Sequence, residues 1–334
     1  ISGGDQPISE NIVHMVLAKL PDAPPGVKGI SLFIVPKFLV NADGSLGARN
    51  DALLAGLFHK MGWRGTTSTA LNFGDNGNCV GYLVGKPHHG LNYMFQMMNE
   101  ARIGVGMGAT MLGYAGYLYS LDYARNRPQG RQPDGKDPSS TQVAIVQHTD
   151  VKRMLLMQKA YVEGAFDLGL FAARLFDDTE TLATAEERTS ALELLDLLTP
   201  IVKSWPSEFC LKANELAIQI RGGHGSPRGC PVEEYYRENR LNPIHEGTHG
   251  IQSLDLLGRK VAMNNGAALK QLLKLIHAAC QRASGYESLD RLRQPLEQLI
   301  ARLSSVTLAL LGDLMSGKVN QGLANSALYL KVFG

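Results

Sequence analysis

The residues best suited to chemistry lie between positions 219 and 252, where a glycine-rich loop, a charged segment and a carboxylate follow one another. Glu246 stands just before a new helical stretch, and Thr248 is suited to cap that helix. The dipole of a helix favours an ionised carboxylate at its N-terminus, and such a group beside a substrate can act as a general base. An isolated glutamate at a helix start is more often only a solvated residue, so its assignment depends on the neighbouring motifs.

The same stretch also matches the zinc-protease pattern HExxH through His245, Glu246 and His249. In such proteases the two histidines lie one turn apart on a helix and bind the metal, while the glutamate acts as base. Here Pro243 precedes the motif and Gly247 interrupts it, which disfavours one continuous helix. A zinc hydrolase using these three residues is therefore the alternative from a different class of enzyme.

Residues 104–109 fit the dinucleotide pattern GxGxxA. A Rossmann turn requires a buried strand before the first glycine, so that backbone N–H groups meet the pyrophosphate. The stretch before Gly104 is polar and helix-like instead. Glycines at this spacing are more typical of close packing between helices, and we expect that role here.

The elements that must position these residues change character along the chain. Residues 1–88 are expected to be strands, at 11–20, 29–40, 66–73 and 79–84, with a turn at 41–44. Long helices are expected at 92–126, 141–176, 186–198 and 201–220, with a break at Thr199-Pro200. These four helices suggest an antiparallel bundle over 89–258, and further helices form a third domain over 259–334. The fold class is therefore α+β, mostly α.

Composition narrows the possible functions. The chain has 334 residues, a formal net charge of +2 and 44% hydrophobic residues, so it is neither disordered nor electrostatically suited to nucleic acid or an anionic membrane. Four widely spaced cysteines without a CxxC pair favour a reducing compartment, and we expect a cytoplasmic protein. No uninterrupted apolar run approaches the ~20 residues of a membrane span. Both ends fall inside expected elements, so we expect a fragment.

Several motifs occur together in one order along the chain. They are GWRGT at 62–66, YARNR at 123–127, QIRGGHG at 219–225, YRENR at 236–240 and HEGTHGIQ at 245–252. This set closely resembles the acyl-CoA dehydrogenase family, in particular its long bacterial members with an extra C-terminal helical domain. The resemblance implies a chain without the family's N-terminal helical domain. Because that domain helps to enclose the acyl and flavin sites in the family, a third hypothesis is that this chain folds but is catalytically inactive.

The resemblance implies FAD-dependent α,β-dehydrogenation of a fatty acyl-CoA to a trans-2-enoyl-CoA. Glu246 matches the base that removes the α-proton, and the β-hydride passes to flavin N5. The thioester carbonyl would be held by the Glu246 backbone N–H and a flavin hydroxyl. The implied partners are an electron-transferring flavoprotein and further copies of the chain, as a homodimer or homotetramer. An acyl-CoA oxidase shares this chemistry and is the alternative within the family.

The resemblance also assigns binding residues, and no metal. The implied FAD contacts are Ser2, Arg127, Gln219, Gly222, Gly223 and Thr248, and the implied substrate-side residues are His245, Gly247 and Arg102. Three positions depart from the family's pattern. His245 replaces the usual Tyr beside the substrate thioester, which implies a different acyl pocket. Gly250 replaces a Gln that often contacts the flavin, and Ser226 stands where Tyr or Phe is usual.

Overall fold

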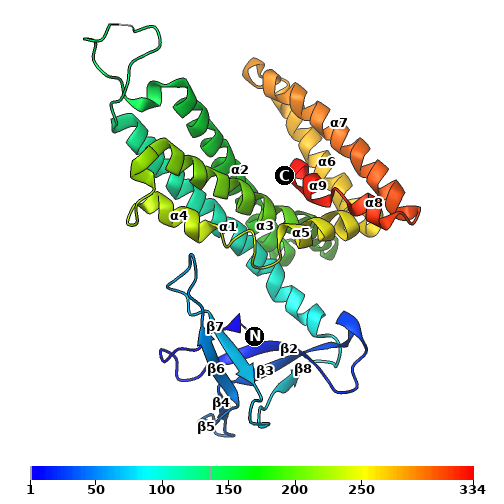
Figure 1. Cartoon of the computed structure of the whole chain (residues 1–334). Coiled ribbons are helices and arrows are strands. Elements are labelled where there is room, and N and C mark those ends of the chain that lie inside the picture. The colour runs from blue at the N-terminus through cyan, green and yellow to red at the C-terminus, as the bar shows by residue number, and fades with distance from the viewer. Residues whose placement is uncertain (1, 136) are drawn as a thin grey trace. The chain divides into compact units, whose positions relative to one another are not determined.

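The computed structural model describes residues 2–135 and 137–334, and it begins with small sheets and continues with helices (Figure 1). Two compact units result, Ile1–Glu100 and Ala101–Gly334. The predicted α+β class with mostly helix is confirmed. The boundaries of the three domains expected from the sequence, 1–88, 89–258 and 259–334, stay predictions.

The first unit holds three antiparallel sheets. Their strand orders are β1-β7-β6, β2-β3-β8 and β4-β5. The strands are β1 Ser2–Gly3, β2 Val13–Lys19, β3 Ile30–Pro36, β4 Phe38–Val40, β5 Leu46–Arg49, β6 Ala52–Leu57, β7 Thr69–Phe73 and β8 Tyr82–Val84. Strand β3 is central because it pairs with β2 on one edge and with β8 on the other. Its apolar residues Leu32 and Val35 are buried.

The expected strands at 11–20, 66–73 and 79–84 are confirmed, and each is shorter than expected. The expected strand over 29–40 is divided at Lys37 into β3 and β4, which belong to different sheets. Strands β5 and β6 were not predicted, since their Gly- and Ala-containing sequences have weak β-propensity. Backbone hydrogen bonds stabilise both strands, because β5 pairs with β4 and β6 pairs with β7.

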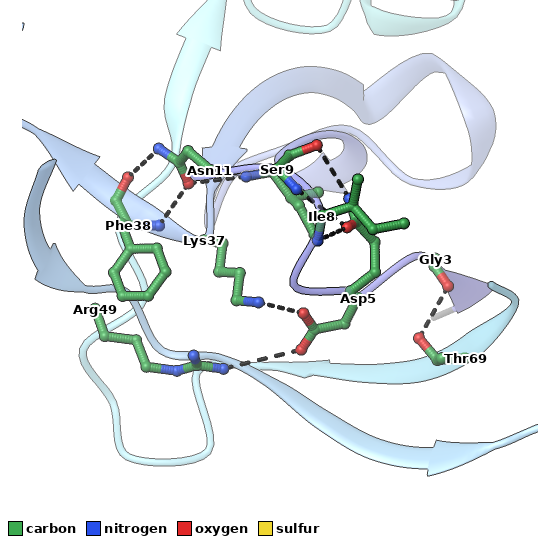
Figure 2. A network of polar contacts seen from close by, with 11 residues as sticks. Gly3, Asp5, Ile8, Ser9, Asn11, Lys37, Phe38, Arg49 and Thr69 are labelled. Atoms are coloured by element: carbon green, nitrogen blue, oxygen red, sulfur yellow. Dashed lines mark hydrogen bonds and ion pairs between the residues drawn. The ribbon is translucent and has the colours of Figure 1, made fainter.

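A polar network ties the N-terminal segment to this unit (Figure 2). Asp5 forms an ion pair with Lys37 and a longer one, 3.9 Å, with Arg49. Thr69 Oγ1 donates to the Gly3 carbonyl at 2.9 Å, beside the pairing of β1 with β7. These contacts fix the backbone of Ser2, an expected flavin contact, whereas its side chain lies outside the described part of the structure.

Three long helices form an antiparallel bundle, and all but the first part of one of them belongs to the second unit. They are α1 Gly90–Asn126, α2 Thr149–Thr181 and α3 Ala185–Arg221. A Cβ on Gly106 would lie 2.0 Å from the Val202 carbonyl oxygen, so this glycine lets α1 approach α3 closely. The GxGxxA pattern therefore lies within a helix, and the expected packing role is confirmed.

The predicted helix break at Thr199-Pro200 is wrong, because α3 runs unbroken through Pro200 and Pro206. Proline removes one backbone donor, a cost of about 3 kcal/mol in a helix interior. Burial of the apolar residues around it offsets that cost, since Leu197, Ile201 and Val202 are almost fully buried. A capping box between Thr184 and Glu187 also fixes the start of the helix.

Shorter helices complete the second unit. They are α4 Pro231–Asn239, α5 His249–Asp255, the π-helical turn η4 Leu256–Lys260, α6 Met263–Ala283, α7 Glu287–Met315, α8 Val319–Leu323 and α9 Ser326–Phe333. Within the described residues, α7 alone is long and apolar enough to cross a bilayer, by length and composition only. One such helix is weak evidence for a membrane span. The sequence itself predicted no apolar run long enough to form one.

Candidate active site

Glu246 lies in a tight turn directly before α5, and the backbone of this turn is strained. Its φ is +53°, in the left-handed region, and the following Gly247 has a φ of +92°. Non-glycine residues rarely adopt this conformation, and when they do the surroundings must hold them there. A Cβ on Gly247 would lie 2.6 Å from Gln252 Nε2, so the turn also requires glycine for space.

Three side chains hold the turn in place. Gln252 Nε2 donates to the Glu246 carbonyl at 2.9 Å, and Lys203 Nζ donates to the Gly247 carbonyl at 2.5 Å. Thr248 Oγ1 accepts from Ile251 N at 3.4 Å, which confirms Thr248 as the expected N-cap of α5. The carboxylate is therefore presented at a helix N-terminus by a backbone fixed at both of its carbonyls.

Lys203 is fully buried on α3, directly beneath this turn. Its pKa is lowered to about 8, chiefly by burial and also by the nearby Arg102 guanidinium, while the charge of Glu246 opposes both effects. A buried ammonium is costly unless an anion or carbonyl compensates it. The Gly247 carbonyl and the Glu246 carboxylate supply that compensation.

Arg102 supplies a second buried cation near Glu246. Burial lowers the pKa of Arg102, whereas the charges of Asp255 and Glu246 raise it. Its Nη1 lies 3.5 Å from Asp255 Oδ2, and the same carboxylate lies 3.8 Å from Lys260 Nζ and 2.6 Å from an Nη of Arg259. Asp255 thus neutralises a cluster of cations behind the turn.

The zinc-protease geometry does not form at this place. Helix α5 begins at His249, so His245 precedes it and the two histidines do not share a helix. His249 Nδ1 contacts Ser204 Oγ, and His245 Nδ1 lies 3.1 Å from the Leu241 carbonyl. Among the described residues no three His, Cys, Asp or Glu side chains come close enough to hold a metal ion.

Ser204, His249 and Glu208 have the residue types of a hydrolytic triad. The contact between Ser204 and His249 is close, and His249 Nε2 lies 3.9 Å from Glu208 Oε2. Ser204 is fully buried, however, so its hydroxyl cannot reach a substrate. Burial also lowers the pKa of His249. We conclude that this contact anchors α5 on α3.

A second place in the helical unit gathers four of the expected cofactor residues. A cavity of about 680 Å³ lies at the ends of α1 and α3 and the start of α2. Its lining includes Arg127, Gln219, Gly222 and Gly223. Arg127 and Gly223 are 96 positions apart in the sequence, and the packing of the bundle brings them together.

The donors at this cavity fit a diphosphate. The Nε atoms of Arg127 and Arg221 are buried, and neither has a hydrogen-bond partner within the described residues. An unpaired buried donor costs about 1–3 kcal/mol. Both guanidinium groups also line one cavity, and arginine matches phosphate geometry well. The residues present therefore fit the diphosphate of FAD.

Reasoning from the sequence thus located Glu246 and its turn, and separately the residues of the cavity. It missed Lys203, which lies in the middle of a helical pattern and looks like an ordinary surface lysine there. It also treated Arg221 only as a letter of the motif QIRGG. A signal for Arg221 was present, since a long cation stands directly before two glycines that leave space for a ligand.

The chain is similar in sequence to a known protein family. Residues 88–261 match the family model described as "Acyl-CoA dehydrogenase, C-terminal domain". The chain is 38% identical over 306 residues to 3-methylmercaptopropionyl-CoA dehydrogenase of Ruegeria pomeroyi, covering 91% of this chain and 51% of that protein. It is 38% identical over 278 residues to a butyryl-CoA dehydrogenase of Syntrophomonas wolfei, covering 82% and 45% respectively.

The solved structures agree in fold. The structure of Caenorhabditis elegans ACDH-11 in complex with C11-CoA aligns with a TM-score of 0.76 at 18% identity, covering 96% of this chain and 52% of that one. A small β unit and a long helical bundle thus define the class. The chain belongs to the acyl-CoA dehydrogenase family. It spans about half the length of the curated relatives that it matches.

Proposed function

We propose that this chain carries the base and part of the cofactor site of an FAD-dependent acyl-CoA dehydrogenase. The observation that carries the proposal is the turn at Glu246, which holds a carboxylate at a helix N-terminus with two buried cations behind it. The backbone that carries this carboxylate is held in one conformation, which is what a positioned general base requires. Relatives at 34–38% identity are named as acyl-CoA dehydrogenases, which supports this reaction class.

The substrate proposed is a saturated fatty acyl-CoA. Glu246 removes the proton from the carbon next to the thioester carbonyl, and the Glu246 backbone N–H donates to the carbonyl oxygen as negative charge develops there. Within the described residues no backbone carbonyl accepts from that N–H, so it is available. Bound FAD would supply the acceptor for the hydride that leaves the β-carbon, and the product would be a trans-2-enoyl-CoA.

Arg127, Gln219, Gly222 and Gly223 would hold the cofactor through its diphosphate. Arg127 lines the cavity, and the glycines allow the backbone to approach the ligand. We further propose that an electron-transferring flavoprotein takes up the electrons and that the protein is a homo-oligomer. The family resemblance supports both proposals.

The test is an anaerobic visible spectrum of the purified protein with FAD, before and after addition of a saturated acyl-CoA. We expect the flavin band to bleach, and the rate of bleaching to fall about 10²- to 10⁴-fold in Glu246→Gln, the range for loss of a positioned base. The matched control is Glu215→Gln, an exposed glutamate on α3. Unchanged bleaching in Glu246→Gln would refute the assignment of the base.

A further inference from the structure

The cavity at the end of α3 has a distinctive charge pattern. Its lining holds two arginines, Arg127 and Arg221, together with His148 and His224, and no carboxylate is among the described lining residues. Neither arginine takes part in an ion pair in the described part of the chain. The field inside the cavity therefore favours an anion.

Arg221 is held in an unusual way. Its guanidinium carbon lies 4.6 Å from the ring centre of Tyr119 and 4.5 Å from that of Tyr123. Stacking on aromatic rings uses the flat faces of the guanidinium and leaves the N–H groups at its edge free to donate. Its Nε is nevertheless buried and has no partner within the described residues.

The place of Arg221 in the chain aims it at the cavity. It is the last residue of α3, where the helix dipole favours a cation, and Gly222 and Gly223 follow. Gly222 has a φ of +56° and open space at its Cβ position, so the backbone turns away directly after the arginine.

We propose that Arg221 is a second cationic contact for the cofactor diphosphate, acting together with Arg127 across the cavity. This inference rests on the proposed function, since the diphosphate is that of FAD. Two guanidinium groups from α3 and from the segment after α1 would each donate to phosphate oxygens, while the tyrosines keep Arg221 preorganised. The resemblance to the family assigns only Arg127 to the diphosphate.

The experiment measures binding rather than turnover. FAD, ADP and AMP are titrated separately into the purified protein by calorimetry, for the original sequence, Arg221→Met and Arg221→Lys. We expect Arg221→Met to weaken FAD and ADP binding about 10- to 100-fold, the range for one lost charge-assisted hydrogen bond. AMP, which lacks the diphosphate, should lose less, and Arg221→Lys should lie between the two.

The control is Arg228→Met, an arginine in the following loop whose side chain is 65% exposed. If FAD binds equally to Arg221→Met and to the original protein, the inference about Arg221 is overturned while the proposed function stands. If the original protein binds neither FAD nor ADP, the proposed cofactor site fails, and this inference fails with it. If Arg221→Met does not fold, Arg221→Lys provides the test. Lysine keeps the positive charge but lacks the planar guanidinium, so full affinity for FAD in this variant would refute a guanidinium contact.

Discussion

Two places in the helical unit hold buried cations, and they differ in what balances the charge. Behind Glu246, Arg102 and Lys260 both lie near Asp255, and Lys260 also lies 3.5 Å from Asp196. At the end of α3, Arg127 and Arg221 face a cavity whose described lining has no carboxylate. The cations behind Glu246 are paired with carboxylates of the chain itself. The two arginines at the cavity have no carboxylate beside them among the described lining residues. Compensation therefore separates residues that build a site from residues that bind its ligand.

The largest effect should follow from removing the compensating carboxylate. We expect Asp255→Asn to lower the free energy of unfolding by about 3–5 kcal/mol, because it leaves buried cations without their anion. Urea denaturation measures this change. Asp150→Asn is the control, since it breaks an exposed pair with Arg153 and should cost at most about 1 kcal/mol. Equal losses in the two variants would remove the distinction between compensated and surface charges.

A smaller effect should appear in the pH dependence of Lys203. Its pKa in the folded protein is about 8, below the usual 10.5, so the unfolded chain binds more protons between these values. Stability contributed by this site is therefore lowest below pH 8 and rises toward pH 10.5. We expect the stability of Lys203→Met relative to the original protein to fall by on the order of 2 kcal/mol from pH 7 to pH 10.5. A difference independent of pH would show that Lys203 titrates normally.

The smallest effect on stability should come from the uncompensated cavity. We expect Arg127→Met to leave the free energy of unfolding unchanged or to raise it by about 1 kcal/mol, because it removes a buried Nε that has no partner within the described residues. The measurement is urea denaturation without any added ligand. A loss above about 1 kcal/mol would mean that Arg127 serves the fold rather than a ligand.

The sequence predicted much of the local structure of the site. The Thr248 cap and the start of α5 follow from short-range preferences, and these hold in the structure. The break at Pro200 was predicted wrongly because burial on α3 outweighs the local cost of proline. Strands β5 and β6 were missed because their stability comes from pairing with distant strands.

The sequence by itself determined the family, the candidate base and the motif residues, because these depend on residue types at fixed spacing. Only the tertiary structure decided that Lys203 lies beneath the Gly247 carbonyl and that Arg127 and Arg221 share one cavity. Burial and charge compensation are properties of three-dimensional packing, since they depend on residues far apart in the chain. A lysine or arginine in a helical pattern has the same spacing whether it faces water, a carboxylate or an empty cavity.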